Sequence, residues 1–161
     1  MSIFHIGQGW DLHRLGPGSS LRLGGVDIPF ERAAIGHSDA DALCHAVIDA
    51  LLGAAHLGDI GRLFPDTDPA YRGINSMELL AIVRERVQAQ GWKPVNLDCT
   101  VILQRPKLVP YIPEMERSLA GALGLPADCV SVKAKTAEGL GSIGAGESLQ
   151  AAAIVLLERA E

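Results

Sequence analysis

The sequence contains few aromatic residues and few cysteines. Only 4% of its 161 residues are Phe, Trp or Tyr although 48% are hydrophobic, so short aliphatic side chains must form most of the core. Such side chains favour closely packed layers of helix on sheet. The three cysteines are an odd number without a closely spaced pair, which argues against a disulfide framework.

The sequence also lacks a basic run and a long apolar run. The formal net charge is −5 at pH 7 and the basic residues are scattered, which argues against a nucleic-acid partner. No apolar stretch reaches the roughly 18 residues of a membrane span. The start of the chain, Met1 to His5, has no basic segment followed by an apolar run, so no secretory signal is visible. We therefore expect a cytoplasmic protein with no membrane partner.

No internal repeat, low-complexity tract or linker divides the chain. A chain of 161 residues is long enough to bury a core of its own, so we expect residues 1–161 to form a single domain.

The hydrophobic pattern predicts a mixture of strands and helices. The expected strands cover residues 3–10, 21–23, 26–28, 97–103, 130–135 and 149–157. The expected helices cover residues 40–57, 76–90 and 112–123. This order indicates an α/β fold of the α+β type, a two-layer sandwich in which helices cover one face of a single mixed β-sheet. The other face would be exposed unless a symmetric oligomer covers it.

Turn and cap residues set the expected ends of these elements. Gly24 and Gly25 are typical of a tight hairpin turn. Ser38 or Asp39 is expected to cap the first helix and Ser76 the second, while Gly58 is expected to end the first. Residues 58–73 are expected to form a polar loop.

Two short patterns carry metal-ligand chemistry. Asp11 and His13 are separated by a single residue, so on an extended strand both side chains point to the same face. His45 lies in the first expected helix, with Asp41 and Asp49 one turn before and after it. Together Asp11, His13 and His45 would form a catalytic zinc set with a free fourth position, although spacing alone is a weak signal. Asp49 either orients His45 by accepting its second ring N–H or is a solvent-facing helix charge.

Two segments around the first expected helix could handle a charged substrate. His37 and Ser38 precede the N-terminus of the helix, and helix N-termini favour bound anions. Considered alone, Ser38 is better explained as a simple helix cap. Asp59, Gly61 and Asp66 lie in the loop after the helix. Acidic residues there either bind polyol hydroxyls or simply keep the loop hydrated.

A third segment lies at the end of a strand. Thr136 could hydrogen-bond a phosphate, and Glu138 could hold a hard divalent cation through phosphate oxygens. The alternative is a frayed strand edge protected by Lys133 and Lys135.

Taken together, these segments resemble the 2-C-methyl-D-erythritol 2,4-cyclodiphosphate synthase family. The agreement runs in the family's order across almost the whole chain. It includes His45 and residues 6–13, 24–29, 37–41, 49–55, 57–61, 64–69, 106–107 and 133–136.

The resemblance implies a homotrimer with each active site between adjacent subunits. It implies Zn²⁺, or another divalent transition metal, on Asp11, His13 and His45, and Mg²⁺ or Mn²⁺ near Glu138 between the substrate phosphates. The family's catalytic phosphate-contacting positions match His37, Ser38 and Thr136. Its positions for binding the rest of the substrate match Asp59, Gly61, Asp66, Leu103, Pro106, Lys107, Leu108, Val109, Ala134 and Lys135.

The implied enzyme is a metal-dependent phosphorus–oxygen lyase of non-mevalonate isoprenoid biosynthesis. It would convert 4-diphosphocytidyl-2-C-methyl-D-erythritol 2-phosphate to the 2,4-cyclodiphosphate and CMP. An oxygen of the 2-phosphate would attack the β-phosphorus within the same molecule. Two cations would offset the repulsion between the two phosphates, and a bent binding mode would align them.

The sequence departs from the family pattern after Glu138. Many members have an arginine where this chain has Ala145, so we expect weak or absent binding of isoprenoid diphosphates in the trimer channel. Two rival functions remain, a non-catalytic trimer that binds nucleotides or isoprenoid phosphates and a metal-dependent nucleotide hydrolase.

Overall fold

The computed structural model describes residues 3–160. The expectation about a secretory signal involves Met1 and Ser2, which lie outside the described residues, as does Glu161 at the end of the expected domain. Within residues 3–160, no helix is both long enough and apolar enough to cross a bilayer.

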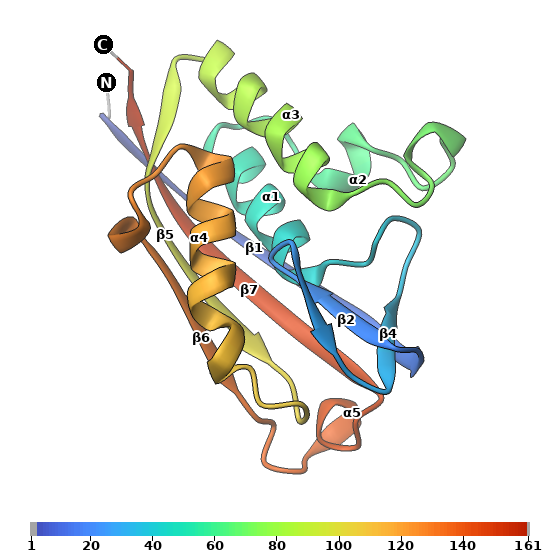
Figure 1. The fold of residues 1–161 in the computed structure, drawn as a ribbon. Coiled ribbons are helices and arrows are strands. Elements are labelled where there is room, and N and C mark those ends of the chain that lie inside the picture. The colour runs from blue at the N-terminus through green and yellow to red at the C-terminus, as the bar shows by residue number, and fades with distance from the viewer. Residues whose placement is uncertain (1–2, 161) are drawn as a thin grey trace.

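A five-stranded mixed sheet forms the back layer of the molecule (Figure 1). Its strands, in spatial order, are β4 (Arg32–Ile35), β1 (Phe4–Pro17), β7 (Ser148–Arg159), β5 (Trp92–Ile102) and β6 (Val130–Lys135). β5 and β6 are parallel and the other neighbours are antiparallel, so the expected mixed sheet is present. β1 and β7 pair along almost their whole length, from Phe4 opposite Glu158 to Arg14 opposite Ser148.

The hairpin does not join this sheet, so the expectation of a single sheet was wrong. β2 (Ser20–Leu23) and β3 (Val26–Pro29) pair only with each other, around Gly24 and Gly25 with φ of 59° and 77°. Leu21, Leu23 and Ile28 are fully buried. The hairpin therefore buries its apolar side chains against the helices instead of extending a sheet edge. The short strand β4, which the sequence pattern missed, takes the edge position beside β1.

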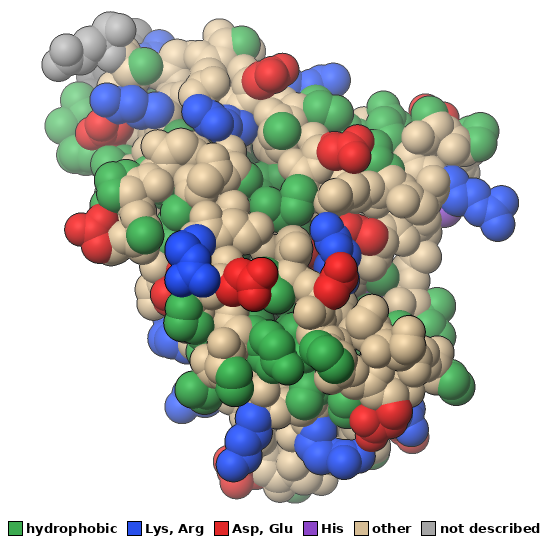
Figure 2. Space-filling view, in the orientation of Figure 1, with side chains coloured by type: hydrophobic (Ala, Val, Ile, Leu, Met, Phe, Trp, Pro, Cys, Tyr) green, Lys and Arg blue, Asp and Glu red, His purple; other side chains and the backbone are tan. Residues whose placement is uncertain are grey.

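Three helices cover one face of the sheet, as expected (Figure 1). They are α1 (Ala42–Ala54), α3 (Ser76–Ala89) and α4 (Ile112–Leu123). α1 is buried on most of its sides, because it packs on β1 and β7 while α3 and the hairpin cover it. On the helix-covered side of the molecule, acidic and basic side chains are interspersed (Figure 2).

α1 touches β1 backbone to backbone. A Cβ atom on Gly9 would lie 1.7 Å from the carbonyl oxygen of Ala46, and one on Gly7 would lie 2.0 Å from that of Ala50. Only glycine at these two strand positions allows the helix to come this close. The contact fixes the distance between the helix and the strand residues that follow Gly9.

The caps differ from those expected. α1 begins after Asp41 rather than after Ser38 or Asp39, and it ends at Ala54, four residues before Gly58. The carboxylate of Asp41 is fully buried. Its burial is offset by hydrogen bonds of 2.7–2.9 Å that it accepts from Cys44 N and from the N–H groups of Gly24 and Gly25 in the hairpin turn. It therefore fastens the hairpin to the helix start.

α3 is also capped by a different residue, and the expected polar loop is partly helical. Asn75, not Ser76, caps α3 by accepting a hydrogen bond from Met77 N. Residues 58–73 contain α2 (Ile60–Leu63) and a 3-10 turn (Pro69–Tyr71). A second short helix, α5 (Gly141–Gly144), precedes β7, and 3-10 turns cover Val109–Tyr111 and Ala127–Cys129.

The face of the sheet opposite the helices is apolar along β1 and β7. Ile6, Trp10, Leu12 and Ile154 alternate with inward-facing residues and are 72%, 51%, 47% and 44% exposed. The same face of β5 and β6 carries charged side chains, such as Asp98 paired with Lys133.

Candidate metal centre

Strand β1 and helix α1 bring three ligand-type side chains together. Asp11 and His13 alternate with the exposed Leu12, so both point to the helix-covered face of the sheet. His45 lies on the first turns of α1, next to Ala46, whose carbonyl oxygen approaches Gly9. The close contact between the two elements therefore places His45 against Asp11.

One oxygen of Asp11 lies between two imidazoles. Asp11 Oδ2 is 3.0 Å from His13 Nδ1 and 3.1 Å from His45 Nδ1. The two rings are 5.4 Å apart at 48° to each other. One ligand atom from each residue lies within 4.8 Å of the others, and all three residues are partly buried.

The two imidazoles change the proton affinity of Asp11, and Asp11 in turn changes that of His45. Burial alone would raise the pKa of Asp11, but the contacts with His13 and His45 outweigh it, so this pKa lies below its ordinary value. Burial alone would lower the pKa of His45, but the hydrogen bond and negative charge of Asp11 outweigh it, so this pKa is raised. The carboxylate is therefore kept ionised, in the form that binds a cation.

The three residues fit a bound divalent cation. His13 Nδ1 is buried and makes no hydrogen bond of good geometry, although it lies 3.0 Å from Asp11 Oδ2. A buried nitrogen in this position suits a lone pair directed at an ion shared with the carboxylate. One carboxylate and two imidazoles are a ligand set for Zn²⁺ or a similar transition metal.

Behind His45 lie contacts that the sequence pattern did not predict. His45 Nε2 is 2.8 Å from Ser76 Oγ and 3.0 Å from Ser38 Oγ. The hydroxyl and the backbone N–H of Ser76 both donate to Asp39. The sequence offered Asp39 and Ser76 only as helix caps, since no local spacing links residues so far apart along the chain.

Asp49 does not orient His45, and it is not a free surface charge either. Its carboxylate accepts a hydrogen bond from Ile60 N at 2.7 Å and so anchors the start of α2. Partial burial raises the pKa of Asp49, the hydrogen bond from Ile60 opposes this, and the charges of Asp59 and Asp11 add to the rise.

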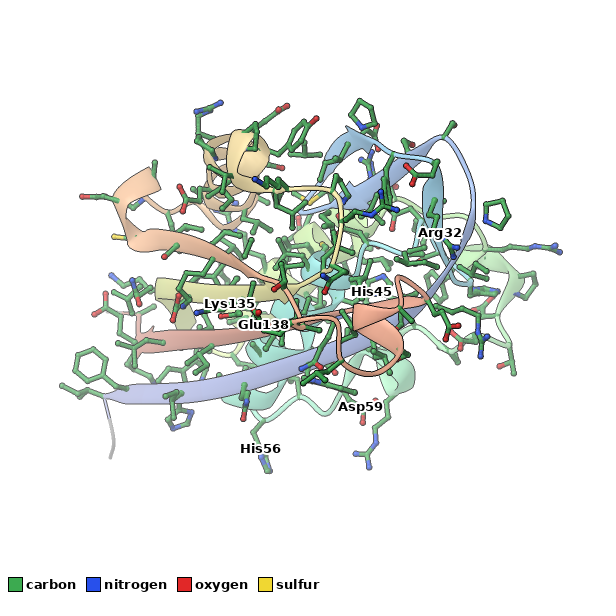
Figure 3. The ribbon with its side chains drawn as sticks, turned by 90° about the horizontal axis from the view of Figure 1, so that it is seen from below. Arg32, His45, His56, Asp59, Lys135 and Glu138 are labelled. Atoms are coloured by element: carbon green, nitrogen blue, oxygen red, sulfur yellow. The ribbon has the colours of Figure 1, made fainter. Side chains whose placement is uncertain are left out.

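A pocket of about 350 Å³ opens over the three ligand-type residues. Seven of the predicted site residues line it: Asp11, His13, His37, Ser38, His45, Gly61 and Asp66. The remaining lining residues are Leu12, Gly36, Ile60, Phe64, Tyr71, Ile74 and Leu79. Asp59 is not among them, because it caps α2 by accepting a hydrogen bond from Arg62 N. In Figure 3 Asp59 lies beyond β1, at the outer side of the molecule.

The other predicted site residues lie elsewhere in the fold, where β5 and β6 end. Leu103 N donates to the carbonyl oxygen of Lys135, and Thr136 Oγ1 donates to Glu138 Oε1 at 3.0 Å. The side chains of Leu103 and Leu108 are buried in the core, so only their backbone groups can face a ligand. The group as a whole comprises Leu103, Pro106, Lys107, Leu108, Val109, Ala134, Lys135, Thr136 and Glu138.

Within one chain these two groups are separated by the width of the sheet. Asp11 lies opposite Ala151, which lies opposite Val101, which lies opposite Ala134. Three strand spacings of roughly 4.8 Å put the Cα atoms of Asp11 and Ala134 about 14 Å apart. In Figure 3 His45 comes from α1, whereas Lys135 and Glu138 come from the end of β6 and the segment after it. None of the β5–β6 group lines the pocket.

Ala145 lies in a different, smaller pocket. This pocket, of about 100 Å³, lies between α5 and the side chains of Arg32 and Arg105. The expectation of weak or absent binding of isoprenoid diphosphates in a trimer channel, drawn from Ala145, stays a prediction.

Comparisons with known proteins place the chain among enzymes of one kind. Residues 4–158 match the model of the YgbB family. A 2-C-methyl-D-erythritol 2,4-cyclodiphosphate synthase from Neisseria meningitidis is 55% identical over 159 residues, which cover 99% of either chain. The corresponding enzyme from Chromobacterium violaceum is 54% identical over 158 residues, 98% of this chain and 100% of the relative.

Solved structures agree with this. A 2C-methyl-D-erythritol-2,4-cyclodiphosphate synthase in a CDP-bound form has a TM-score of 0.88 at 45% identity, covering 95% of this chain and 99% of the other. The bifunctional IspDF of Campylobacter jejuni has a TM-score of 0.93 at 40% identity. That comparison covers 97% of this chain but only 42% of the bifunctional protein.

Proposed function

The chain belongs to the YgbB family, and from this premise we propose that it is a 2-C-methyl-D-erythritol 2,4-cyclodiphosphate synthase. The observation that carries the proposal is the Asp11–His13–His45 cluster at the base of a pocket, in a chain that matches such synthases over its full length. The substrate would be 4-diphosphocytidyl-2-C-methyl-D-erythritol 2-phosphate, and the products the cyclic diphosphate and CMP.

The proposed reaction moves one phosphoryl group within a single molecule. An oxygen of the 2-phosphate attacks the β-phosphorus, and the bond from that phosphorus to the oxygen bridging it to the α-phosphate breaks. CMP leaves with the bond's electron pair. This closes the ring without water and makes the enzyme a phosphorus–oxygen lyase in isoprenoid precursor biosynthesis.

Asp11, His13 and His45 would hold a divalent transition metal such as Zn²⁺. When bound, this metal supplies positive charge that offsets the repulsion between the two phosphates. Ser38 and His37 line the same pocket and can donate hydrogen bonds to phosphate oxygens. Gly61 and Asp66 line it beside Phe64, where a carboxylate can accept hydrogen bonds from polyol hydroxyls. The protein thus holds the substrate bent so that its two phosphates meet.

We further propose that two subunits complete each site in a homotrimer. The β5–β6 group, with Thr136, Glu138 and Lys107, lies too far from His45 in one chain to act on the same phosphates. A neighbouring copy would bring this group to the pocket, with Mg²⁺ or Mn²⁺ held near Glu138 and the cytidine near Lys107. The apolar strip of Ile6, Trp10, Leu12 and Ile154 supports association, because exposed apolar strips of this kind commonly lie in interfaces.

The compartment we propose is the cytoplasm. Cys44 and Cys99 are buried free thiols, and Cys129 is also unpaired. Unpaired cysteines are typical of proteins in a reducing compartment.

Phosphorus NMR of the reaction products tests the proposal. The wild-type protein, incubated with the substrate and both kinds of metal ion, should give CMP and the cyclic diphosphate, and a chelator should stop the reaction. An uncyclised phosphate would instead indicate a nucleotide hydrolase. Binding of the substrate without release of CMP would indicate a non-catalytic binding protein.

The matched variants for this test are Asp11→Asn and Asp128→Asn. Asp11→Asn should reduce the rate of CMP release about 100-fold or more, because it weakens binding of the proposed metal ion that offsets the negative charge of the phosphates. Asp128 is exposed, lies in the 3-10 turn before β6 and does not line the pocket, so Asp128→Asn should behave as the wild-type protein. Normal turnover by Asp11→Asn would show that the ligand assignment is wrong.

A further inference from the structure

A chain of polar contacts runs from His45 away from the pocket and into the protein. His45 Nε2 lies 2.8 Å from Ser76 Oγ at the start of α3. Ser76 donates its hydroxyl to Asp39 Oδ1, and its backbone N–H to Asp39 Oδ2 at 2.9 Å. Arg22, on the β2–β3 hairpin, pairs with Asp39 through its Nε at 3.1 Å. Three segments, carrying Ser76, Asp39 and Arg22, therefore meet behind one imidazole.

The direction of each hydrogen bond follows from the chemistry of its groups. An ionised carboxylate only accepts, so the Ser76 hydroxyl must donate its single proton to Asp39. The oxygen of Ser76 then has only lone pairs left to offer, and His45 Nε2 must be the donor. The chain of contacts thus keeps a proton on Nε2 and leaves Nδ1, the nitrogen that faces Asp11, to bind a cation.

Burial distinguishes Ser76 from the other hydroxyl beside His45. Ser38 lines the pocket, where the proposed substrate phosphate would compete for its hydroxyl. Ser76 is fully buried, and Asp39 is 15% exposed. A buried donor or acceptor that loses its hydrogen-bond partner lowers the stability of the folded protein. The hydrogen bonds of Ser76 are therefore strongly favoured in the folded state.

We propose that Ser76 and Asp39 are positioning residues for His45: they hold its proton on Nε2 and direct Nδ1 to the metal. Hydrogen-bonded partners of this kind commonly fix the orientation of metal-binding histidines and raise metal affinity. The inference rests on the proposed function only in taking Asp11, His13 and His45 as metal ligands.

The first experiment measures the affinity for Zn²⁺ by competition with a chromophoric chelator. Ser76→Ala removes the buried acceptor of the Nε2 proton, leaving only the pocket-lining Ser38 hydroxyl beside it, and should weaken Zn²⁺ binding about 10–100-fold. Asn75→Ala is the matched control, because it removes the cap of the same helix without touching His45. Its Zn²⁺ affinity should stay close to that of the wild-type protein.

Each outcome of this titration decides a different point. Equal Zn²⁺ affinities for Ser76→Ala and the wild type would overturn the positioning role. Equal losses in Ser76→Ala and Asn75→Ala would reduce that role to folding of the α3 N-terminus. A wild-type protein that does not bind Zn²⁺ would instead overturn the proposed metal site.

A second experiment on the wild-type protein alone does not depend on a variant that folds. In NMR spectra of the Zn²⁺-loaded protein, the ring proton of His45 should be on Nε2, shifted downfield and slow to exchange with water, because Ser76 accepts it. A proton on Nδ1, with Nε2 bound to the metal, would contradict the proposal. If Ser76→Ala folds, the same proton should exchange faster.

Discussion

A single carboxylate oxygen of Asp11 contacts the imidazoles of both His13 and His45. On the opposite side of the His45 ring, Nε2 contacts Ser76, which is hydrogen-bonded to Asp39. The sequence offered Asp39, as an alternative to Ser38, and Ser76 as helix caps, but Asp41 and Asn75 cap the two helices, and Asp39 accepts a hydrogen bond from Asp41 N without capping α1. The contacts of Ser76 and Asp39 behind His45 could not be predicted, because they depend on α3 packing across the start of α1. Asp11, His13 and His45 were candidates from their residue types and spacing, but this spacing is common, so the resemblance was needed to single them out.

Asp49 allows a prediction about stability at the residue scale. Asp49→Ala removes the acceptor of Ile60 N and should lower the free energy of unfolding by about 1 kcal/mol. Asp49→Asn keeps an acceptor oxygen and removes the charge. Chemical denaturation of both variants at several pH values measures the two effects.

The expected pH dependence of Asp49→Asn follows from the raised pKa of Asp49. A carboxyl group with a folded pKa above its unfolded value weakens the folded state at high pH. Asp49→Asn should therefore be at least as stable as the wild type at pH 8. This difference should shrink as the pH falls through the folded pKa towards 3.8. A destabilisation equal to that of Asp49→Ala at pH 8 would contradict this account.

At the scale of elements, the sequence predicted the helices and strands that have a clear apolar periodicity. It did not predict the elements that form only through contacts with distant parts of the chain. α4 and β6 have the expected bounds, because their apolar periodicity is clear and Gly124, with φ of 69°, ends the helix. β4 was missed because Arg32–Ile35 has no strand pattern of its own and is extended only through its pairing with β1. α2 was missed because it is four residues long and is held by Asp59 and Asp49.

The contact between β1 and α1 gives a prediction at this scale. Gly9→Ala should lower the free energy of unfolding by roughly 3 kcal/mol or more, because its Cβ would overlap backbone atoms of Ala46 and Ala50. The displaced helix should also weaken Zn²⁺ binding. Denaturant unfolding and the chelator competition measure both effects.

The control for Gly9→Ala is Gly53→Ala, on α1 itself. A Cβ there meets nothing within 4 Å, and alanine favours helix, so this variant should be as stable as the wild type or up to about 1 kcal/mol more stable. If Gly9→Ala were equally harmless, the close contact would not be what positions His45.

For the whole molecule, the two separated groups of predicted site residues give a prediction about assembly. Trp10→Glu places a charge in the apolar strip and should convert the proposed trimer to monomers in analytical ultracentrifugation. CMP release should then fall on the order of 100-fold or more, because positioning of the two phosphates is lost. Zn²⁺ affinity should be retained, because Asp11 and His13 point to the other face.

Ile82→Glu is the matched control for this variant. Ile82 is an exposed apolar residue on α3, on the helix-covered side of the sheet, where no subunit contact is proposed. It should leave both the assembly and the activity unchanged. Monomeric Trp10→Glu with full activity would show that one chain is sufficient for catalysis.

The origin of Asp11, His13 and His45 in one polypeptide has a consequence for biogenesis. If these three residues hold the proposed metal, a newly synthesised subunit already carries all three ligands and can bind the ion before it assembles with other copies. When the metal is scarce, each subunit would then bind an ion, or fail to bind one, independently of the others. Partly loaded assemblies, with some sites filled and others vacant, are the expected product of such scarcity.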